Sequence, residues 1–215
     1  MAKARIIALS NARDGQDETY LAWYREHHLG DLKAIDGVLT GDLHESAHDG
    51  ARWRYMGVYT VDDDTIAGVL AAIAERRGTE LMPMTDAIDS SSVAFLCLET
   101  LEVAGSQTDN ADFRLLTLAA PADGLLADLD TWYKEQHIPD MLAIDGFHHA
   151  AYHGFGEGTR GTDAAWMRAG LYEAHGDDGS AILARIGAAA SSGAMRMSPA
   201  LDRSAGYTHL YRRIG

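Results

Sequence analysis

The sequence predicts an α+β fold in which one β-α-β-β-α-β unit occurs twice in a single chain. Three observations support this prediction. One sequence motif occurs twice in the chain, and apolar residues follow strand-like and helix-like spacings in the same order around both copies. A third observation is a short stretch of small and polar residues between the copies. It divides the chain into a first repeat over 1–104, a linker over 105–112 and a second repeat over 113–215.

The duplicated segment is the strongest of these observations. Residues 23–37 read WYREHHLGDLKAIDG and residues 132–146 read WYKEQHIPDMLAIDG, so nine of 15 positions are identical. Two unrelated segments of this length would share roughly one position. Further matches join His44 to His153, Trp53 to Trp166, and Tyr59 to Tyr172. We therefore interpret the two halves as repeats of one unit.

Each copy contains the same elements in the same order. The predicted ranges are a strand (5–10 and 113–119), a helix (19–35 and 126–144), two strands (38–44 and 147–153, then 52–60 and 165–173), a helix (66–77 and 181–190) and a last strand (93–101 and 207–214). This order is that of the ferredoxin-like unit, an antiparallel sheet with both helices on one face. Such a unit leaves its other sheet face bare, so we expect the sibling sheet to cover it.

Composition excludes several classes of partner. Lys and Arg total 18 against 32 Asp and Glu, which gives a formal net charge of −14. A nucleic-acid or anionic-membrane partner requires a basic face, which this balance argues against. No apolar run approaches the roughly 18 residues that span a bilayer, and the one cysteine, Cys97, cannot form an internal disulfide. These features predict a cytoplasmic protein.

The repeated motif Trp-Tyr-x-Glu-x-His-x-x-Asp-x-x-x-Ile-x-Gly, placed in such a unit, resembles the dimeric α+β barrel superfamily and most of all its EthD-like branch. The resemblance covers nearly the whole chain, once per half, as a tandem fused duplication. A proline that is common after the helical histidine is present as Pro139 but replaced by Gly30 in the first half. The resemblance implies that the two repeats form the barrel within one chain. It constrains the chemistry little, because the superfamily includes cyclases, isomerases, dehydratases, cofactor-free monooxygenases and haem-degrading enzymes.

The histidine of the repeated motif is the main catalytic candidate. His28 and His137 fall on or beside the sheet-facing stripe of the first helix in each copy. Asp31 and Asp140 follow three residues later, a spacing at which a carboxylate can accept a hydrogen bond from one imidazole nitrogen. We predict that the histidines act as general acid or base and that the aspartates orient them. The alternative is a buried histidine satisfied by the backbone and the aspartate.

Candidate substrate-binding residues come from three elements in each copy. The second strand carries a histidine that we expect to face the helical histidine across a pocket, and the third strand has one aromatic face interrupted by a glycine. The first helix adds a tyrosine near its histidine. The candidates are His44, His153, Tyr24, Tyr133, Trp53, Trp166, Tyr55, Arg168, Tyr59 and Tyr172. The alternative for the aromatic residues is core packing, and for the strand histidines a place at the solvent rim.

These observations predict a small cytoplasmic enzyme that uses histidine-assisted proton transfer without a metal or other cofactor. The reaction would be of the isomerase, cyclase or dehydratase-type lyase class, on a hydrophobic aromatic or polyketide-like substrate. Alternatives are a non-catalytic binding or accessory protein of a catabolic pathway, a cofactor-free monooxygenase, and a haem-binding member of the superfamily. The fused barrel predicts either a monomer with a pseudo-dimeric barrel or a homodimer.

Overall fold

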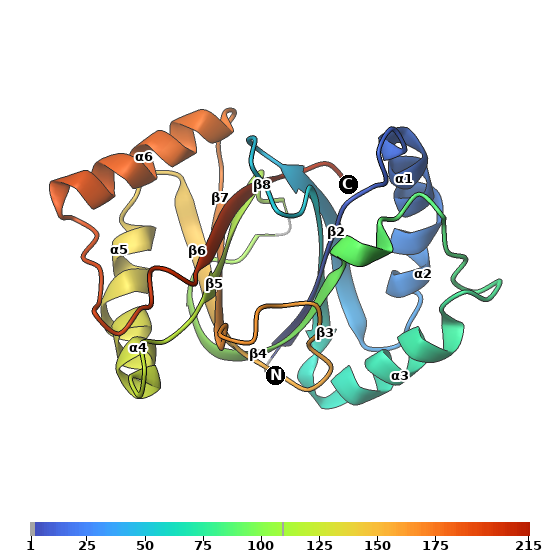
Figure 1. Cartoon of the computed structure of the whole chain (residues 1–215), viewed down its shortest axis with the longest axis horizontal. Helices are drawn as coiled ribbons and strands as arrows, with labels where there is room; N and C mark the ends of the chain where they lie inside the picture. The colour runs from blue at the N-terminus through green and yellow to red at the C-terminus, as the bar shows by residue number, and fades with distance from the viewer. Residues whose placement is uncertain (1–2, 109) are drawn as a thin grey trace.

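A closed barrel of eight antiparallel strands forms the centre of the computed structural model, which describes residues 3–108 and 110–215 (Figure 1). The strands succeed one another around the barrel in the order β1-β3-β2-β8-β5-β7-β6-β4. Their bounds are β1 Lys3–Ser10, β2 Val38–Ser46, β3 Tyr55–Asp62, β4 Ala94–Gly105, β5 Phe113–Ala119, β6 Phe147–Phe155, β7 Arg168–Ala174 and β8 Tyr207–Arg213. The predicted α+β class is confirmed.

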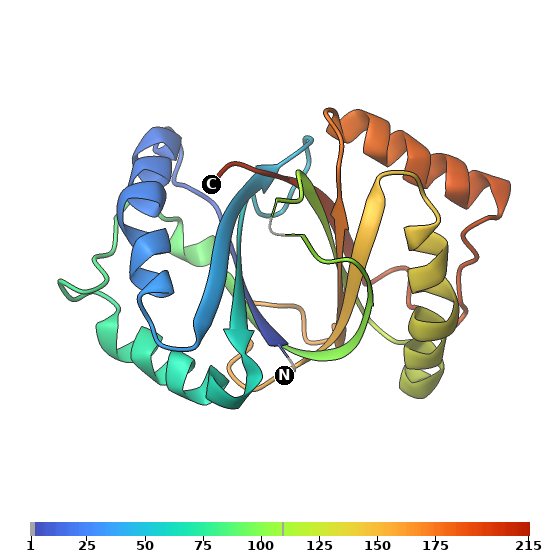
Figure 2. The same ribbon diagram turned by 180° about the vertical axis from the view of Figure 1, so that it is seen from behind.

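The helices lie outside the barrel in two groups on opposite sides (Figure 2). The group of the first half comprises α1 (Asp17–Trp23), α2 (Leu29–Lys33) and α3 (Ile66–Arg76). The other comprises α4 (Leu126–Trp132), α5 (Ile138–Leu142) and α6 (Gly179–Ser192). Within the described residues, no helix is both long enough and apolar enough to cross a bilayer.

The two halves join edge to edge. In the first half β1 lies between β3 and β4, and in the second β5 lies between β7 and β8. The edge strand β4 pairs with β6 over seven residue pairs, and β2 pairs with β8 over three. Each edge strand thus finds a partner for its free backbone groups, which leaves no open sheet edge. The sheets therefore cover each other by closing a barrel rather than by stacking as separate layers.

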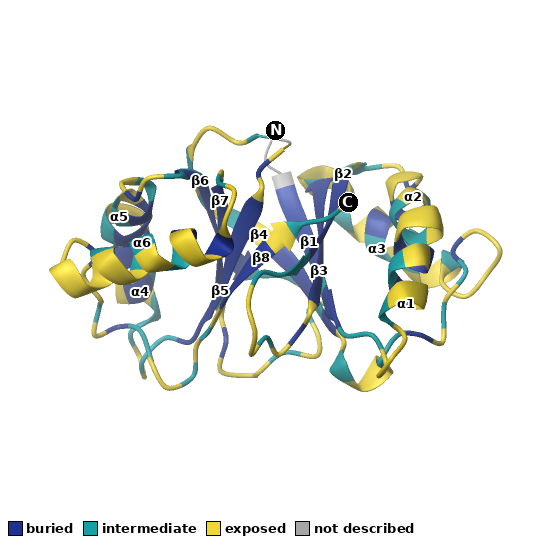
Figure 3. Ribbon diagram, turned by 90° about the horizontal axis from the view of Figure 1, so that it is seen from above, coloured by how far each residue is buried: buried dark blue, intermediate teal, exposed yellow. Residues whose placement is uncertain are grey.

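Strand alternation divides the core into the barrel interior and two layers between sheet and helices. On β1, Ile7 and Leu9 belong to the cluster inside the barrel, whereas Ile6 packs with the helices of the first half. Figure 3 shows the buried strands in the middle and the exposed outer surfaces of the helices on both flanks. Successive residues of a strand point to opposite faces, so each strand contributes to both cores.

A π-helical turn interrupts the first helix of each half. We predicted continuous helices over 19–35 and 126–144, but α1 is followed by a π turn over Tyr24–His28 and α4 by one over Tyr133–His137. The backbone N–H of Leu29 donates to the carbonyl of Tyr24, five residues earlier. A π turn inserts one residue into the helical repeat and rotates the helix before the turn relative to the helix after it. The helical phase inferred for an uninterrupted α-helix therefore does not apply across this turn.

Candidate functional site

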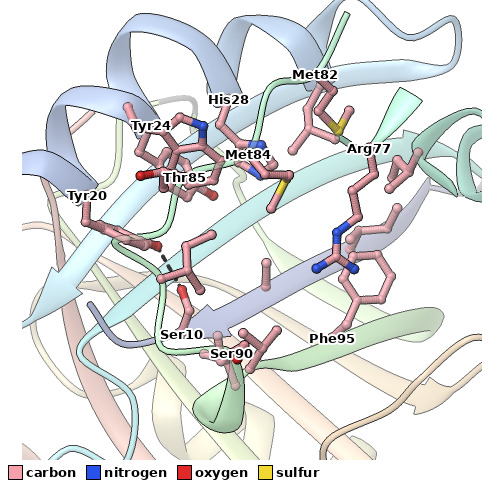
Figure 4. A pocket seen from close by; sticks show the side chains of 18 of the residues that line it. Ser10, Tyr20, Tyr24, His28, Arg77, Met82, Met84, Thr85, Ser90 and Phe95 are labelled. Atoms are coloured by element: carbon pink, nitrogen blue, oxygen red, sulfur yellow. Dashed lines mark hydrogen bonds between the residues drawn. The ribbon is translucent and has the colours of Figure 1, made fainter. Parts of the chain in front are cut away.

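A cavity of about 630 Å³ lies between the helices and the sheet of the first half (Figure 4). The helices contribute Trp23, Tyr24 and His28, and the sheet contributes Tyr59 and Phe95. The segment after α3 and a loop from the second half complete the wall. Such a chamber, mainly apolar and aromatic with a few polar groups, is suited to a small hydrophobic ligand.

His28 is half-buried and has one ring nitrogen without a partner among the described residues. Its imidazole stacks on the indole of Trp23 at a centroid distance of 4.4 Å and meets the ring of Tyr24 edge-on at 5.0 Å. Burial, assisted by the positive charge of Arg77, lowers the pKa of His28 to about 4. Nδ1 is buried and has no hydrogen-bond partner among the described residues. At neutral pH this is a neutral imidazole able to accept a proton or a hydrogen bond.

The predicted orienting role of the aspartates does not appear in the geometry. Oδ2 of Asp31 is buried without a hydrogen-bond partner in the described part of the chain, so no bond joins it to His28. Asp140 accepts a hydrogen bond from the backbone N–H of Arg196 at 3.4 Å instead of from His137. The expectation assumed an uninterrupted α-helix, whereas the π turn places each imidazole against a tryptophan five residues earlier.

Two tyrosines lie at the bottom of the cavity beside His28. The hydroxyls of Tyr24 and Tyr59 hydrogen-bond to each other at 2.5 Å. Gly57 makes this contact possible, since a Cβ atom there would collide with the Tyr24 hydroxyl oxygen. Burial raises the pKa of both tyrosines, so their hydroxyls stay protonated. The glycine between aromatic residues thus makes room for a tyrosine of the protein itself.

The second half repeats the stack without sharing the cavity. The imidazole of His137 lies on the indole of Trp132 at 4.5 Å, and burial lowers the pKa of His137 to about 4. Tyr133 and Tyr172 both meet His137 edge-on, at 5.1 Å and 5.9 Å. None of these four residues is part of the wall of the first-half cavity.

Larger side chains occupy the corresponding region of the second half. Phe147 stands where the first half has Val38, and Tyr152 stands where it has Leu43. Both are buried in the core between the sheet and the helices of the second half. Tyr152 stacks on Tyr133 with centroids 4.2 Å apart. The repeats therefore share a motif but differ in how the space beside its histidine is used.

The two strand histidines lie inside the barrel, on the opposite side of the sheet from the helices. Leu43 packs with the helices of the first half, so its neighbour His44 faces the interior. Burial lowers the pKa of His44, with Arg114 adding to the effect, and lowers the pKa of His153 to about 3, with Arg5 adding. The expectation that they face the helical histidines across a pocket is wrong, because the intervening sheet separates them.

The two candidate tryptophans precede β3 and β7 and also pack inside the barrel. Trp53 and Trp166 meet at a centroid distance of 6.3 Å within one apolar cluster. Their indole N–H groups donate to the backbone carbonyls of Ser92 and Ala205. They therefore pack the core rather than line the cavity.

The last pair of candidates ties the sheet to the helices. The Tyr55 hydroxyl donates to a carboxylate oxygen of Asp17 at 2.8 Å. Arg168, at the equivalent position, donates through two nitrogens to both carboxylate oxygens of Asp130, at 2.7 and 2.8 Å. Tyrosine and arginine thus perform the same anchoring task with different chemistry.

Of the predicted site residues, the cavity brings together His28, Tyr24 and Tyr59. The sequence interpretation missed the cavity residues Arg77 and Arg160. Arg160 belongs to a loop over 156–161 in the second half. Its backbone N–H donates to the carbonyl of Phe95 at 2.8 Å, and its carbonyl accepts from the N–H of Phe95 at 2.9 Å, which fixes the loop as part of the cavity wall. Nothing in the local sequence indicates that this loop reaches the other half.

Metal ligation receives no support from the side chains. Across residues 3–108 and 110–215 there is no group of three or more His, Cys, Asp or Glu residues arranged to hold a metal ion. The ten histidines of the sequence are distributed over the barrel interior, the helices and the loops.

No protein-family model and no curated protein matches the sequence. Solved structures do match in fold. An anthrone oxidase-like protein aligns over 100% of this chain and 92% of its own, with a TM-score of 0.64 and 11% identity. A mutant chlorite dismutase from Candidatus Nitrospira defluvii aligns over 100% of this chain and 93% of its own, with a TM-score of 0.62 and 10% identity. A monooxygenase-like protein from Fusobacterium nucleatum aligns over 100% of this chain and 93% of its own, with a TM-score of 0.61 and 8% identity. These neighbours are dimeric α+β barrel proteins, and this chain has that fold, with all eight strands supplied by one polypeptide.

Proposed function

We propose that this protein is an enzyme that transfers a proton on a hydrophobic, aromatic or polyketide-like substrate held in the first-half cavity. The observation that carries the proposal is a neutral, half-buried imidazole in the wall of a 630 Å³ aromatic chamber, whose Nδ1 has no partner among the described residues. Perturbed titratable groups in clefts are concentrated at functional sites. His28 lines the cavity and keeps part of its surface accessible, so a substrate held there would contact it.

The proton-transfer step depends on the state of His28. The imidazole takes a proton from a carbon next to a carbonyl; the C–H electron pair passes to the carbonyl oxygen, and imidazolium and enolate result. Return of the proton from the imidazolium to another carbon gives an isomer. In dehydration the imidazolium instead protonates a neighbouring hydroxyl group, which leaves as water and restores the neutral imidazole. Because the pKa of His28 is about 4, the imidazole is a weak base. It therefore requires an acidified C–H group, such as one between two carbonyls or in an anthrone-like ring.

We assign this activity to the first half. Tyr24 and Tyr59 share the cavity with His28, whereas Phe147 and Tyr152 add bulk beside His137. In this proposal a tandem duplication produced two EthD-like repeats, of which the first kept the substrate site. The second repeat closes the barrel and provides the loop over 156–161.

Cofactor-free oxygenation is a second candidate, favoured by the anthrone oxidase-like and monooxygenase-like structural neighbours. It would begin with the same proton removal by His28. The resulting carbanion would then transfer electrons to O2, which serves as both oxidant and co-substrate. Consumption of O2 in step with substrate loss distinguishes this reaction from isomerisation or dehydration.

Haem binding fits the residues poorly. A histidine that ligates iron usually donates its second ring N–H to an acceptor that fixes its orientation. Nδ1 of His28 has no such acceptor among the described residues, although Asp31 is three residues away. We therefore route no step through haem. Absorbance in the Soret region of freshly purified protein tests this point directly.

The decisive experiment compares two matched variants, His28→Gln and His137→Gln, on candidate anthrone-like and β-dicarbonyl compounds. Glutamine keeps a polar amide but cannot act as a base at neutral pH. We expect a loss of about 10²–10⁴-fold in kcat for His28→Gln, as for removal of a general base. His137→Gln should keep kcat. Equal activity of His28→Gln and the unchanged protein would refute the assignment, and ligand binding without turnover would support a carrier.

The barrel needs no second copy, because one chain supplies its eight strands. We propose that the protein functions as a monomer with a pseudo-dimeric barrel. A homodimer formed through the outer helices is the alternative. Light scattering coupled to size exclusion distinguishes the two by mass.

A further inference from the structure

The cavity wall is positively charged in a protein that is strongly acidic overall. Arg13, Arg77 and Arg160 line the cavity, and Asp86 is the one carboxylate among its described lining residues. The chain as a whole has a net charge of −14. A local excess of arginine against such a background marks a place where anions are favoured.

Arg77 has the position of a ligand-binding group. It directly follows α3, and Figure 4 shows its guanidinium extending beside Phe95, on the side of the cavity also occupied by Met82. Its guanidinium forms no ion pair and no hydrogen bond with the described residues. Its charge acts on the imidazole of His28, whose pKa it helps to lower. The cation is therefore unpaired and close to the proposed base.

The second half lacks these cations at the matching positions. Ala122 stands in place of Arg13, and Ala190 stands in place of Arg77. The third cation reaches the cavity from the other half, where Arg160 donates to the carbonyl of Gly158 and places its guanidinium 4.3 Å from the centroid of the Phe95 ring. Positive charge is thus collected around the one cavity from both halves of the chain.

We propose that the ligand of this cavity is an aromatic acid, whose carboxylate or other anionic group binds to Arg77 while its rings lie against Tyr24, Tyr59 and Phe95. This inference rests on the proposed function, since it specifies the substrate class for the same cavity. A guanidinium binds a carboxylate through two parallel N–H groups, which fixes the orientation of the ligand as well as its charge. The rest of the ligand would then extend toward His28.

The test uses two probes of the same shape and different charge, 2-naphthoate and 2-naphthamide. Their dissociation constants are measured by calorimetry at pH 7.5 and low ionic strength, because salt screens an exposed guanidinium. At this pH His28 is neutral, so a preference for the anion cannot come from its imidazole. We expect the unchanged protein to bind 2-naphthoate about tenfold more tightly, the effect of one charge-assisted contact at a partly exposed site.

Three variants locate the source of the preference. Arg77→Met keeps much of the side-chain length without the charge and should bind the two probes equally. Arg77→Lys keeps the charge but not the fork of donors and should retain part of the preference. Arg203→Met is the matched control, because it removes one exposed positive charge in the second half, outside the cavity lining, and should leave the preference unchanged.

The outcomes separate this inference from the proposed function. Equal binding of the two probes by the unchanged protein, or a preference that survives in Arg77→Met, overturns the aromatic-acid inference and leaves a hydrophobic cavity intact. Failure of both probes to bind the unchanged protein overturns the hydrophobic-ligand proposal and this inference with it. Loss of turnover in His28→Gln, with the probe preference kept, supports both.

Discussion

Trp23 stacks on His28 with ring centroids 4.4 Å apart and an interplanar angle of 24°, although the two residues are five positions apart in the sequence. The pair Trp132 and His137 repeats this geometry at 4.5 Å and 23°. In an uninterrupted α-helix, residues five apart lie on different faces. The π turn in each half brings them together, and π turns inside α-helices are frequent at functional sites.

The indole of Trp23 keeps water from the imidazole, so Trp23→Ala should raise the pKa of His28 from about 4 toward the 6.5 of an exposed histidine. NMR titration of the His28 ring protons measures this directly. Trp132→Ala is the matched control, since it removes the equivalent indole and should shift only His137. An unchanged His28 pKa in Trp23→Ala would mean that other neighbours provide the burial.

The buried histidines make stability depend on pH in a defined window. The pKa values of His28, His137 and His209 are lowered to about 4, and that of His153 to about 3, from the 6.5 of the unfolded chain. Between these values the unfolded state binds more protons than the folded state. Their contribution is therefore fully present above pH 6.5 and is lost as the pH falls toward 4.

Urea unfolding at pH 7.5, 6, 5 and 4.5 should accordingly show a falling free energy of unfolding as the solution is acidified. His28→Gln should make this dependence shallower by about one proton, because one titrating group is removed. A stability that is flat between pH 6.5 and 4.5 would contradict the burial of these imidazoles in solution.

Gly57 allows Tyr24 to approach the sheet, so Gly57→Ala should destabilise the protein by about 1–3 kcal/mol through overpacking. It should also separate the hydroxyls of Tyr24 and Tyr59. Gly68→Ala is the control, since Gly68 lies exposed in α3 and an added Cβ would meet nothing within 4 Å. That change should stabilise the protein by about 0.5–1 kcal/mol through helix propensity. Thermal melting of the two variants gives the comparison, and equal melting temperatures would count against the packing described.

Sequence periodicity was sufficient to predict the fold class and the positions of the strands. The duplicated segment over 23–37 and 132–146 indicated two similar halves, and the strand predicted over 5–10 is found as part of β1. His28 could be found because it lies in that duplicated segment, on the helix face that packs against the sheet. These features depend on local spacing, which the sequence carries directly.

The remaining parts of the site depend on relationships that local spacing does not encode. The π turn, which decides that His28 meets Trp23 rather than Asp31, has no recognisable residue pattern. The sequence placed His44 on the correct strand. Whether its side chain faces the helices or the barrel interior could be seen only in the packed structure. Arg160 reaches the cavity only because the barrel closes and brings β6 and its loop beside β4.

Arg5 and Arg114 occupy matching positions inside the barrel but differ in their partners. Arg114 forms ion pairs with Glu173 at 3.2 Å and with Asp42 at 3.5 Å, and all three side chains are largely buried. Arg5 is equally buried and forms no ion pair with the described residues, and burial lowers its pKa to about 10. A buried charge without a partner costs stability, whereas removing one member of a buried pair leaves its partner uncompensated.

The same substitution should therefore have opposite effects at the two sites. Arg5→Met should be neutral or raise the free energy of unfolding by up to about 1–2 kcal/mol, since it removes an unpaired buried cation near Arg114. Arg114→Met should lower the free energy of unfolding by about 3–5 kcal/mol, because Glu173, which is 2% exposed, loses its guanidinium. Urea denaturation at pH 7.5 measures both changes against the same baseline.

A strong loss of stability in Arg5→Met would show that Arg5 has an anionic partner in solution. The double variant Arg114→Met, Glu173→Gln should regain part of the lost free energy of unfolding. Such a gain would confirm that the cost of Arg114→Met comes from the uncompensated carboxylate of Glu173.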